Sequence, residues 1–240
     1  MSENLASLHR HEEEIRRESL VSVETEVALA DHLQAAHDAL DQLIALQNAG
    51  SIPGDDVHTA QLFTIRLFNI GASTLKLGLS GYYQQAFQLL RDSLEIVNLL
   101  DLFRADHAKL AEWRLADNKV LKKKFGPAAV RSALDAHPQY KGQKAGRDRI
   151  YAMFSEHAAH ATYRGFNLIA PGNSPRIGPF FDSKLLRALL EDLGKHLAHA
   201  TLAVSTLFSK AEEPAVLASR SAYLVKLARY QGKYIKISSA

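Results

Sequence analysis

The sequence predicts an all-α protein, a single helical bundle, and three observations support this prediction. Seven prolines punctuate the 240 residues, and long helices can form in the intervals between them because proline breaks helix interiors. Within these intervals apolar residues recur at steps of three and four, which places them on one face of a helix. No segment shows a convincing alternation of period two, so essentially no sheet is expected.

The first predicted helix runs from about residue 12 to 48, because leucines and alanines from Leu29 to Leu43 line one stripe and Asn48-Ala49-Gly50 supplies a stop. Residues 1–50 are therefore expected to form a long acidic N-terminal helix that packs on a bundle of residues 51–240. Further helices are expected at 57–79, although Gly71 and Gly78 weaken this one, and then at 82–103, 106–124, 127–136, 146–164, 182–209 and 213–231. Two stretches are expected to be irregular, 137–146 and the proline-rich 166–180.

Composition narrows the class of protein. Hydrophobic residues make up 47% and charged residues 23%, as in an ordinary globular protein. The absence of cysteine excludes a disulfide framework, a thiolate zinc site and a cysteine nucleophile. The N-terminus is polar and acidic, and no run of about 18 apolar residues occurs, so a cytoplasmic protein without membrane association is expected. Walker, GxGxxG, GxSxG and HExxH motifs are missing, and no cofactor is expected.

Charge is distributed unevenly along the chain. Residues 1–60 carry twelve acidic against three basic side chains, whereas residues 104–150 carry twelve basic against five acidic. The two surfaces can neutralise each other within the fold or between subunits, or the basic half can attract RNA through its phosphates. The expected RNA contacts are Lys122, Lys123, Lys124, Arg147, Arg149 and Arg164.

Two short segments, SEHAAHAT and KHLAHAT, each bring two imidazoles and a carboxylate to one strip of a helix. The side chains are Glu156, His157 and His160 in the first, and Asp192, His196 and His199 in the second. Facing helices of a bundle could complete a Zn, Mn, Fe or Ni site from such ligands. Metal binding is therefore an alternative interpretation, as is a surface or interfacial role for these histidines.

A second constellation is Arg91-Asp92-Ser93-Leu94-Glu95, in which Arg91 and Glu95 lie one helical turn apart and can form an ion pair. If the pair is partly buried, it can orient a bound group. The alternative is a structural ion pair that ties this helix to its neighbours.

The segments LLRDSLEIVNLLDLF and RDRIYAMFSEHAAHATYRG resemble a group of uncharacterised bacterial helical proteins related to the HEPN (higher eukaryotes and prokaryotes nucleotide-binding) superfamily. An Arg-x-x-x-Glu helix followed by a Tyr-x-x-Leu/Phe-Ser-Glu-x-x-x-His helix is typical of that group, and the resemblance covers roughly residues 80–165. It implies a helical bundle, commonly a homodimer, and in active members a metal-independent ribonuclease of toxin or phage-defence systems. The positions that match the pattern are Arg91, Glu95, Tyr151, Ser155 and His160.

One departure from the family concerns its nuclease centre, an Arg followed by a His after four to six residues. Here Arg149 and His157 have seven residues between them, which on a helix separates them by about 12 Å along the axis. A composite centre is the remaining catalytic hypothesis, with His160 as general acid or base and Arg91, Arg149 or Arg164 stabilising the phosphorane. A non-catalytic helical dimer, whose acidic N-terminal helix binds a protein partner and whose basic half contacts RNA, is the alternative.

Overall fold

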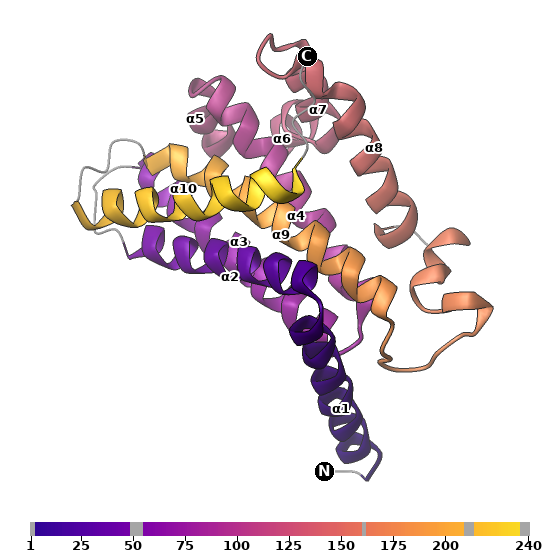
Figure 1. Cartoon of the computed structure of the whole chain (residues 1–240). Helices are drawn as coiled ribbons and strands as arrows, with labels where there is room; N and C mark the ends of the chain where they lie inside the picture. The colour runs from indigo at the N-terminus through magenta and orange to yellow at the C-terminus, as the bar shows by residue number, and fades with distance from the viewer. Residues whose placement is uncertain (1–2, 49–54, 160–161, 209–213, 236–240) are drawn as a thin grey trace.

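A computed structural model of the chain describes residues 3–48, 55–159, 162–208 and 214–235. All regular structure in these residues is helical, which confirms the predicted all-α fold (Figure 1). None of the described helices is long and apolar enough to cross a membrane. The α-helices are α1 (Glu3–Thr25), α2 (Val27–Gln47), α3 (Asp55–Leu79), α4 (Tyr83–Ala105), α5 (Ala108–Leu115), α6 (Asn118–Lys124), α7 (Pro127–Ala136), α8 (Lys144–Phe154), α9 (Ser183–Ser205) and α10 (Pro214–Tyr234).

The predicted N-terminal helix over 12–48 is wrong in one respect, because the structure divides it into α1 and α2 at Glu26. Glu26 has extended backbone angles, φ −119° and ψ 109°. Just before it, the Thr25 hydroxyl donates to the carbonyls of Val21 and Ser22, at 3.0 and 3.1 Å. Figure 1 shows α1 extending away from the other helices, whereas α2 packs within the bundle against α9 and α3. Residues 1–50 are therefore not one continuous helix.

The centre of the bundle is formed by α2, α3, α4 and α9, which contact one another along their leucine-rich faces. Gly78, which counts against a helix in isolation, allows α3 to lie close to α9, because a Cβ at this position would lie 2.0 Å from Leu189 Cδ2 and would displace that side chain. Gly81 turns the chain from α3 into α4 with φ +85°, and a Cβ there would lie 2.4 Å from the carbonyl oxygen of Phe180. These two glycines let α3 and the α4 turn approach their neighbours closely.

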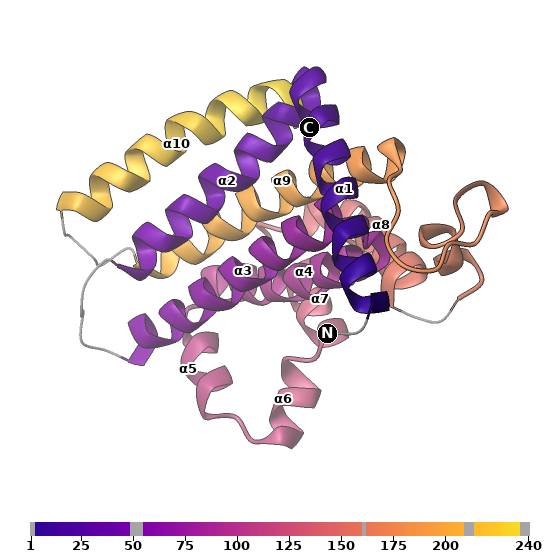
Figure 2. The ribbon, with the colours of Figure 1, turned by 90° about the horizontal axis from the view of Figure 1, so that it is seen from below.

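Helix α10 covers α2 and neutralises part of its acidic surface. Lys226 pairs with Asp38 at 2.7 Å, and Lys233 pairs with Asp31 at 2.9 Å. The charge asymmetry of the sequence is thus partly balanced within the fold. Figure 2 shows α10 and α2 on one side of α3 and α4, and α5 and α6 on the other.

Two further helices differ from the sequence predictions. The helix expected over 106–124 is broken into α5 and α6, because Asp117 caps α6 by accepting a hydrogen bond from the Val120 amide at 2.7 Å. The helix expected over 146–164 ends earlier: α8 passes into a π-helical turn, Ser155–Ala159, and Arg164–Leu168 forms a short 3₁₀ helix. The expected irregular stretch 137–146 contains a 3₁₀ turn, Lys141–Gln143, and the first residues of α8. The stretch 166–180 contains only short 3₁₀ turns.

Candidate functional site

Helix α8 packs against α4 and brings the two segments of the predicted motif together. A guanidinium nitrogen of Arg91 donates to the Tyr151 hydroxyl at 3.4 Å, and its carbon lies 5.6 Å from the centre of the Tyr151 ring. The same guanidinium forms an ion pair of 2.8 Å with Glu95, one turn along α4. Both members of the pair are partly buried, with side-chain exposures of 22% and 29%. The structure therefore places Arg91, Glu95 and Tyr151 at one site.

Sequence reasoning missed a second arginine at this site. Arg131 of α7 stacks its guanidinium on Tyr151, with the guanidinium carbon 3.5 Å from the centre of the ring. A signal for it was present, because Arg131-x-x-x-Asp135 repeats the Arg-x-x-x-acid spacing of Arg91 and Glu95. In the structure, however, Asp135 pairs with other residues, so Arg131 is directed to Tyr151. We call Arg91, Glu95, Arg131, Tyr151 and Ser155 the Arg91 cluster.

The hydrogen-bonding groups of the Arg91 cluster are incompletely used. Arg91 Nε and Arg131 Nη1 are buried, and no described residue accepts a hydrogen bond from either nitrogen. A buried guanidinium N–H without an acceptor is costly, so such groups usually have a protein, water or ligand partner. Both nitrogens are donors on positively charged groups, so an anionic oxygen is the partner that would satisfy them.

The cluster also changes the acidity of its phenol. Burial by itself raises the pKa of Tyr151, but hydrogen bonds from the Arg131 and Arg91 guanidinium groups outweigh it, and the pKa lies below the usual value of 10. Positive charge thus dominates the field at Tyr151. Glu95 is the acid of the cluster and neutralises one of its two arginines.

The described residues among the predicted metal ligands do not converge. His196 donates from Nδ1 to the carbonyl of Asp192 at 2.7 Å and meets Phe154 edge-on, with ring centres 5.3 Å apart. His199 instead faces Asp101, at 3.1 Å. Burial lowers the pKa of His196 to about 4 and raises that of Asp192 to about 6.

On the other segment, Glu156 forms an ion pair with Arg164 at 2.8 Å, and His157 is partly buried. No three histidine or carboxylate side chains of the described ranges come together as a metal-binding group. The arrangement of these residues does not fit the metal alternative. His160, which the sequence assigns as general acid or base, lies outside the described residues.

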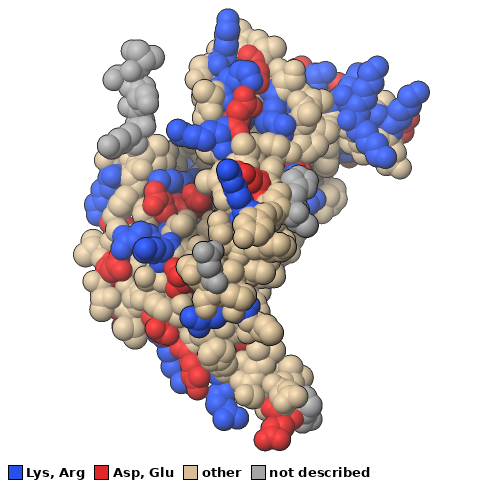
Figure 3. All heavy atoms as spheres, turned by 90° about the vertical axis from the view of Figure 1, so that its right-hand side faces the viewer, with Lys and Arg blue, Asp and Glu red and all other residues tan. Residues whose placement is uncertain are grey.

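The predicted RNA contacts fall into two groups. Lys122, Lys123 and Lys124 are exposed at the end of α6, where Lys124 pairs with Glu112, and Arg149 and Arg164 are also exposed. Figure 3 shows the face of the molecule that carries α8, and Lys and Arg dominate its upper part.

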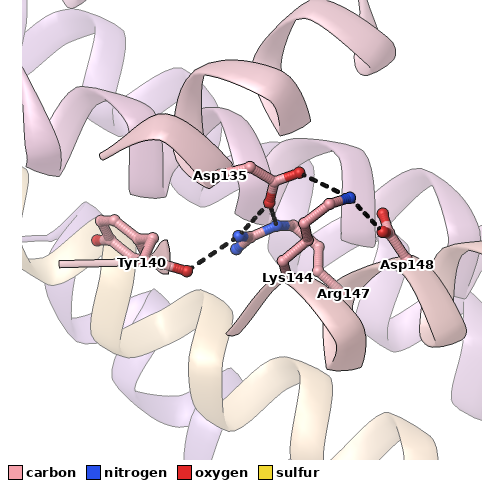
Figure 4. Close-up of polar contacts among 5 residues, drawn as sticks. All are labelled: Asp135, Tyr140, Lys144, Arg147 and Asp148. Atoms are coloured by element: carbon pink, nitrogen blue, oxygen red, sulfur yellow. Dashed lines mark hydrogen bonds and ion pairs between the residues drawn. The ribbon is translucent and has the colours of Figure 1, made fainter. Parts of the chain in front are cut away.

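Arg147 differs from the other predicted contacts because it is only 8% exposed. Its Nη2 donates to Asp135 at 2.8 Å and to the carbonyl of Tyr140 at 3.2 Å (Figure 4). The Arg147 guanidinium holds the pKa of Asp135 below its usual value. The prediction of Arg147 as an RNA contact is corrected accordingly, because its donors face protein acceptors in the interior.

No family model, curated protein or solved structure was found to match the chain. The chemistry of the Arg91 cluster is therefore the guide to function.

Proposed function

We propose that the protein binds single-stranded RNA and that the Arg91 cluster holds a phosphate of the RNA backbone. The convergence of two arginines on Tyr151, with Arg91 Nε and Arg131 Nη1 lacking acceptors, carries this proposal. Planar guanidinium groups match the geometry of phosphate oxygens, and a partly buried site strengthens each charged hydrogen bond. Tyr151 and Ser155 add neutral hydroxyls that can donate to the remaining oxygens.

The surroundings favour an extended polyanion over a single small anion. Exposed basic side chains occur on the adjoining α8 and at the end of α6, including Arg149 and Lys122–Lys124. Such residues attract a strand of phosphates through counterion release, which makes binding strongly salt-dependent. We choose single-stranded RNA over a duplex because a local cluster with neighbouring basic side chains suits a single strand.

The test is the binding of a fluorescently labelled single-stranded RNA by anisotropy over a series of salt concentrations. For Arg131→Ala we expect about a tenfold loss of affinity and a salt dependence whose slope falls by about one. Arg187→Ala is the matched control, because it removes the same charge from α9, where Arg187 pairs with Glu26. Equal losses in the two variants would mean that the effect is general electrostatics and would contradict the proposal.

RNA cleavage is the catalytic form of the same proposal, in line with the HEPN resemblance. His160 would transfer the proton while the arginines of the Arg91 cluster stabilise the phosphorane. We expect the protein to cleave single-stranded RNA in the presence of a chelator. This cleavage should be lost in His160→Ala but not in His199→Ala. Cleavage that is unchanged in His160→Ala would contradict this assignment.

The homodimer stays a prediction that light scattering of the purified protein tests directly, and a protein partner for the N-terminal helix also stays a prediction. If no RNA binds at low salt and a stable dimer is found, the non-catalytic interaction protein is the function that replaces this proposal.

A further inference from the structure

A small cavity of about 160 Å³ adjoins the Arg91 cluster. We call it the α4–α7 pocket, since residues of α4 and α7 form much of its wall, together with α3 and α5. Glu95 belongs to both sites: it pairs with Arg91 at 2.8 Å and also lines the cavity. Val130, the residue before Arg131 in the chain, lines it from α7. The pocket and the cluster are thus neighbours that share a wall.

The pocket has an aromatic side and a polar side. Phe63 and Trp113 form the aromatic side, with ring centres 5.2 Å apart and planes inclined by 36°. Asn98 and Asp92 lie among the polar lining residues, and Arg66 donates to both carboxylate oxygens of Asp92, at 2.9 and 3.0 Å. This combination of an aromatic surface with a few polar groups is typical of a site for a planar heterocycle.

Asn98 is one of the polar residues that line the cavity. It is only 7% exposed and its side-chain amide makes no hydrogen bond with another described residue, yet its amide atoms are not among the fully enclosed polar atoms that lack a partner. The amide offers two donors and one acceptor to a molecule in the cavity. It therefore suits a partner that both accepts and donates, as the edge of a nucleobase does.

We propose that the α4–α7 pocket takes one unstacked cytosine base of an RNA strand whose phosphate lies at the Arg91 cluster. This inference rests on the proposed function and specifies its substrate. The cavity is smaller than the roughly 300–1,000 Å³ of sites for drug-sized ligands, so it admits a single ring and not a whole nucleotide. Asp92 and Glu95 are acceptors, and carboxylates recognise the exocyclic amine of cytosine, which uracil lacks.

The protein contains a built-in probe of this pocket, because Trp113 is its single tryptophan. Titration with oligocytidine should quench the tryptophan fluorescence in proportion to binding, since a base stacked near the indole changes its surroundings. An abasic oligomer of equal length keeps the phosphates and should bind about tenfold more weakly without quenching. Oligouridine should bind more weakly than oligocytidine, and oligoadenosine, with its double ring, should resemble the abasic strand.

Two variants complete the test. Trp113→Ala should bind oligocytidine and the abasic strand with equal affinity. In case this variant does not fold, Asn98→Leu keeps the size of the side chain and should reduce the preference for oligocytidine over oligouridine at least threefold, with an unchanged affinity for the abasic strand. Circular dichroism establishes that each variant is folded before binding is measured.

The outcomes separate this inference from the proposed function. If neither oligocytidine nor the abasic strand binds at low salt, both are overturned. If the abasic strand and oligocytidine bind equally and fluorescence stays constant, the phosphate site stands and the base pocket is overturned. A preference for oligoadenosine or oligouridine over oligocytidine also overturns the assignment of cytosine.

Discussion

Two arginine clusters lie one helical turn apart along α8, at Arg147 and at Tyr151, and they differ in how completely their donors are used. The first is the Arg147 cluster, which consists of Asp135, Tyr140, Lys144, Arg147 and Asp148 (Figure 4). There Arg147 reaches Asp135 with Nε at 3.3 Å and Nη2 at 2.8 Å, and Lys144 reaches the other oxygen of the same carboxylate at 3.3 Å. Each buried charge has a partner of opposite sign.

The second is the Arg91 cluster, one helical turn further along α8 at Tyr151. Here two guanidinium groups face one phenol, a single carboxylate, Glu95, pairs with Arg91, and buried N–H groups stay without acceptors. We call the Arg147 cluster saturated, because its buried charges are all paired, and the Arg91 cluster unsaturated, because some of its buried donors are not. A saturated cluster contributes to the stability of the fold, whereas an unsaturated cluster lowers the stability until a ligand pairs with its donors. Arg131 and Arg147 belong to the neighbouring helices α7 and α8, yet their roles differ. The acceptors around an arginine therefore indicate its role better than its position in the fold does.

The largest effect is expected from a substitution that breaks the Arg147 cluster. Arg147→Met leaves Asp135 with only Lys144, which is 58% exposed, as its partner, and the unfolding free energy should fall by about 3 kcal/mol, because the buried member of the ion pair is lost and the carboxylate is poorly compensated. Urea denaturation measures the change. An unfolding free energy within about 0.5 kcal/mol of the wild type would show that the Arg147 cluster is not structural.

The same substitution at the unsaturated cluster should have the opposite sign. Arg131→Met removes a buried N–H that lacks an acceptor, and we expect the unfolding free energy of the RNA-free protein to rise by about 1 kcal/mol while RNA affinity falls. Thermal unfolding without and with RNA checks both parts. Destabilisation similar to that of Arg147→Met would make the two clusters equivalent and remove the contrast.

A third experiment follows the ionisation of Tyr151. Because the folded pKa lies below the usual 10, the folded protein loses this proton at a lower pH than the unfolded chain, so stability should rise with pH as the solution approaches pH 10. Ultraviolet absorbance of the phenolate reports the titration directly. In Arg131→Ala the midpoint should move upward, and in Tyr151→Phe this step should vanish; an early step that persists in Tyr151→Phe belongs to another tyrosine.

The smallest effect is expected at the rim of the saturated cluster. Asp148 pairs with Lys144 at 2.6 Å, but the two side chains are 49% and 58% exposed. Exposed ion pairs contribute little because water and salt screen them, so Asp148→Ala should shift the melting temperature by less than about 2 °C. A shift as large as that of Arg147→Met would mean that the exposed pair, and not the buried one, holds this part of the fold.

Local sequence patterns predicted most of the helices, since they depend on neighbours three or four residues apart. The predictions were wrong where a tertiary contact or a local cap competes with helical propensity, as at Glu26 and at Asp117. The Arg91–Glu95 pair was also predictable, because both residues belong to one helical turn. The role of these residues in function stays a prediction.

The sequence by itself determined the helical class, the positions of α3, α4, α7 and α9, and the partnership of Arg91 with Glu95, because helix periodicity is a local property. Only the tertiary structure decided that Arg131 stacks on Tyr151 while Arg147 is buried against Asp135. Both arginines belong to the same basic stretch of sequence, and their surroundings are set by the packing of α7 and α8, which brings together residues from distant turns. The acceptors near a charge depend on that packing, and they distinguish a charge that holds the fold from one that awaits a ligand.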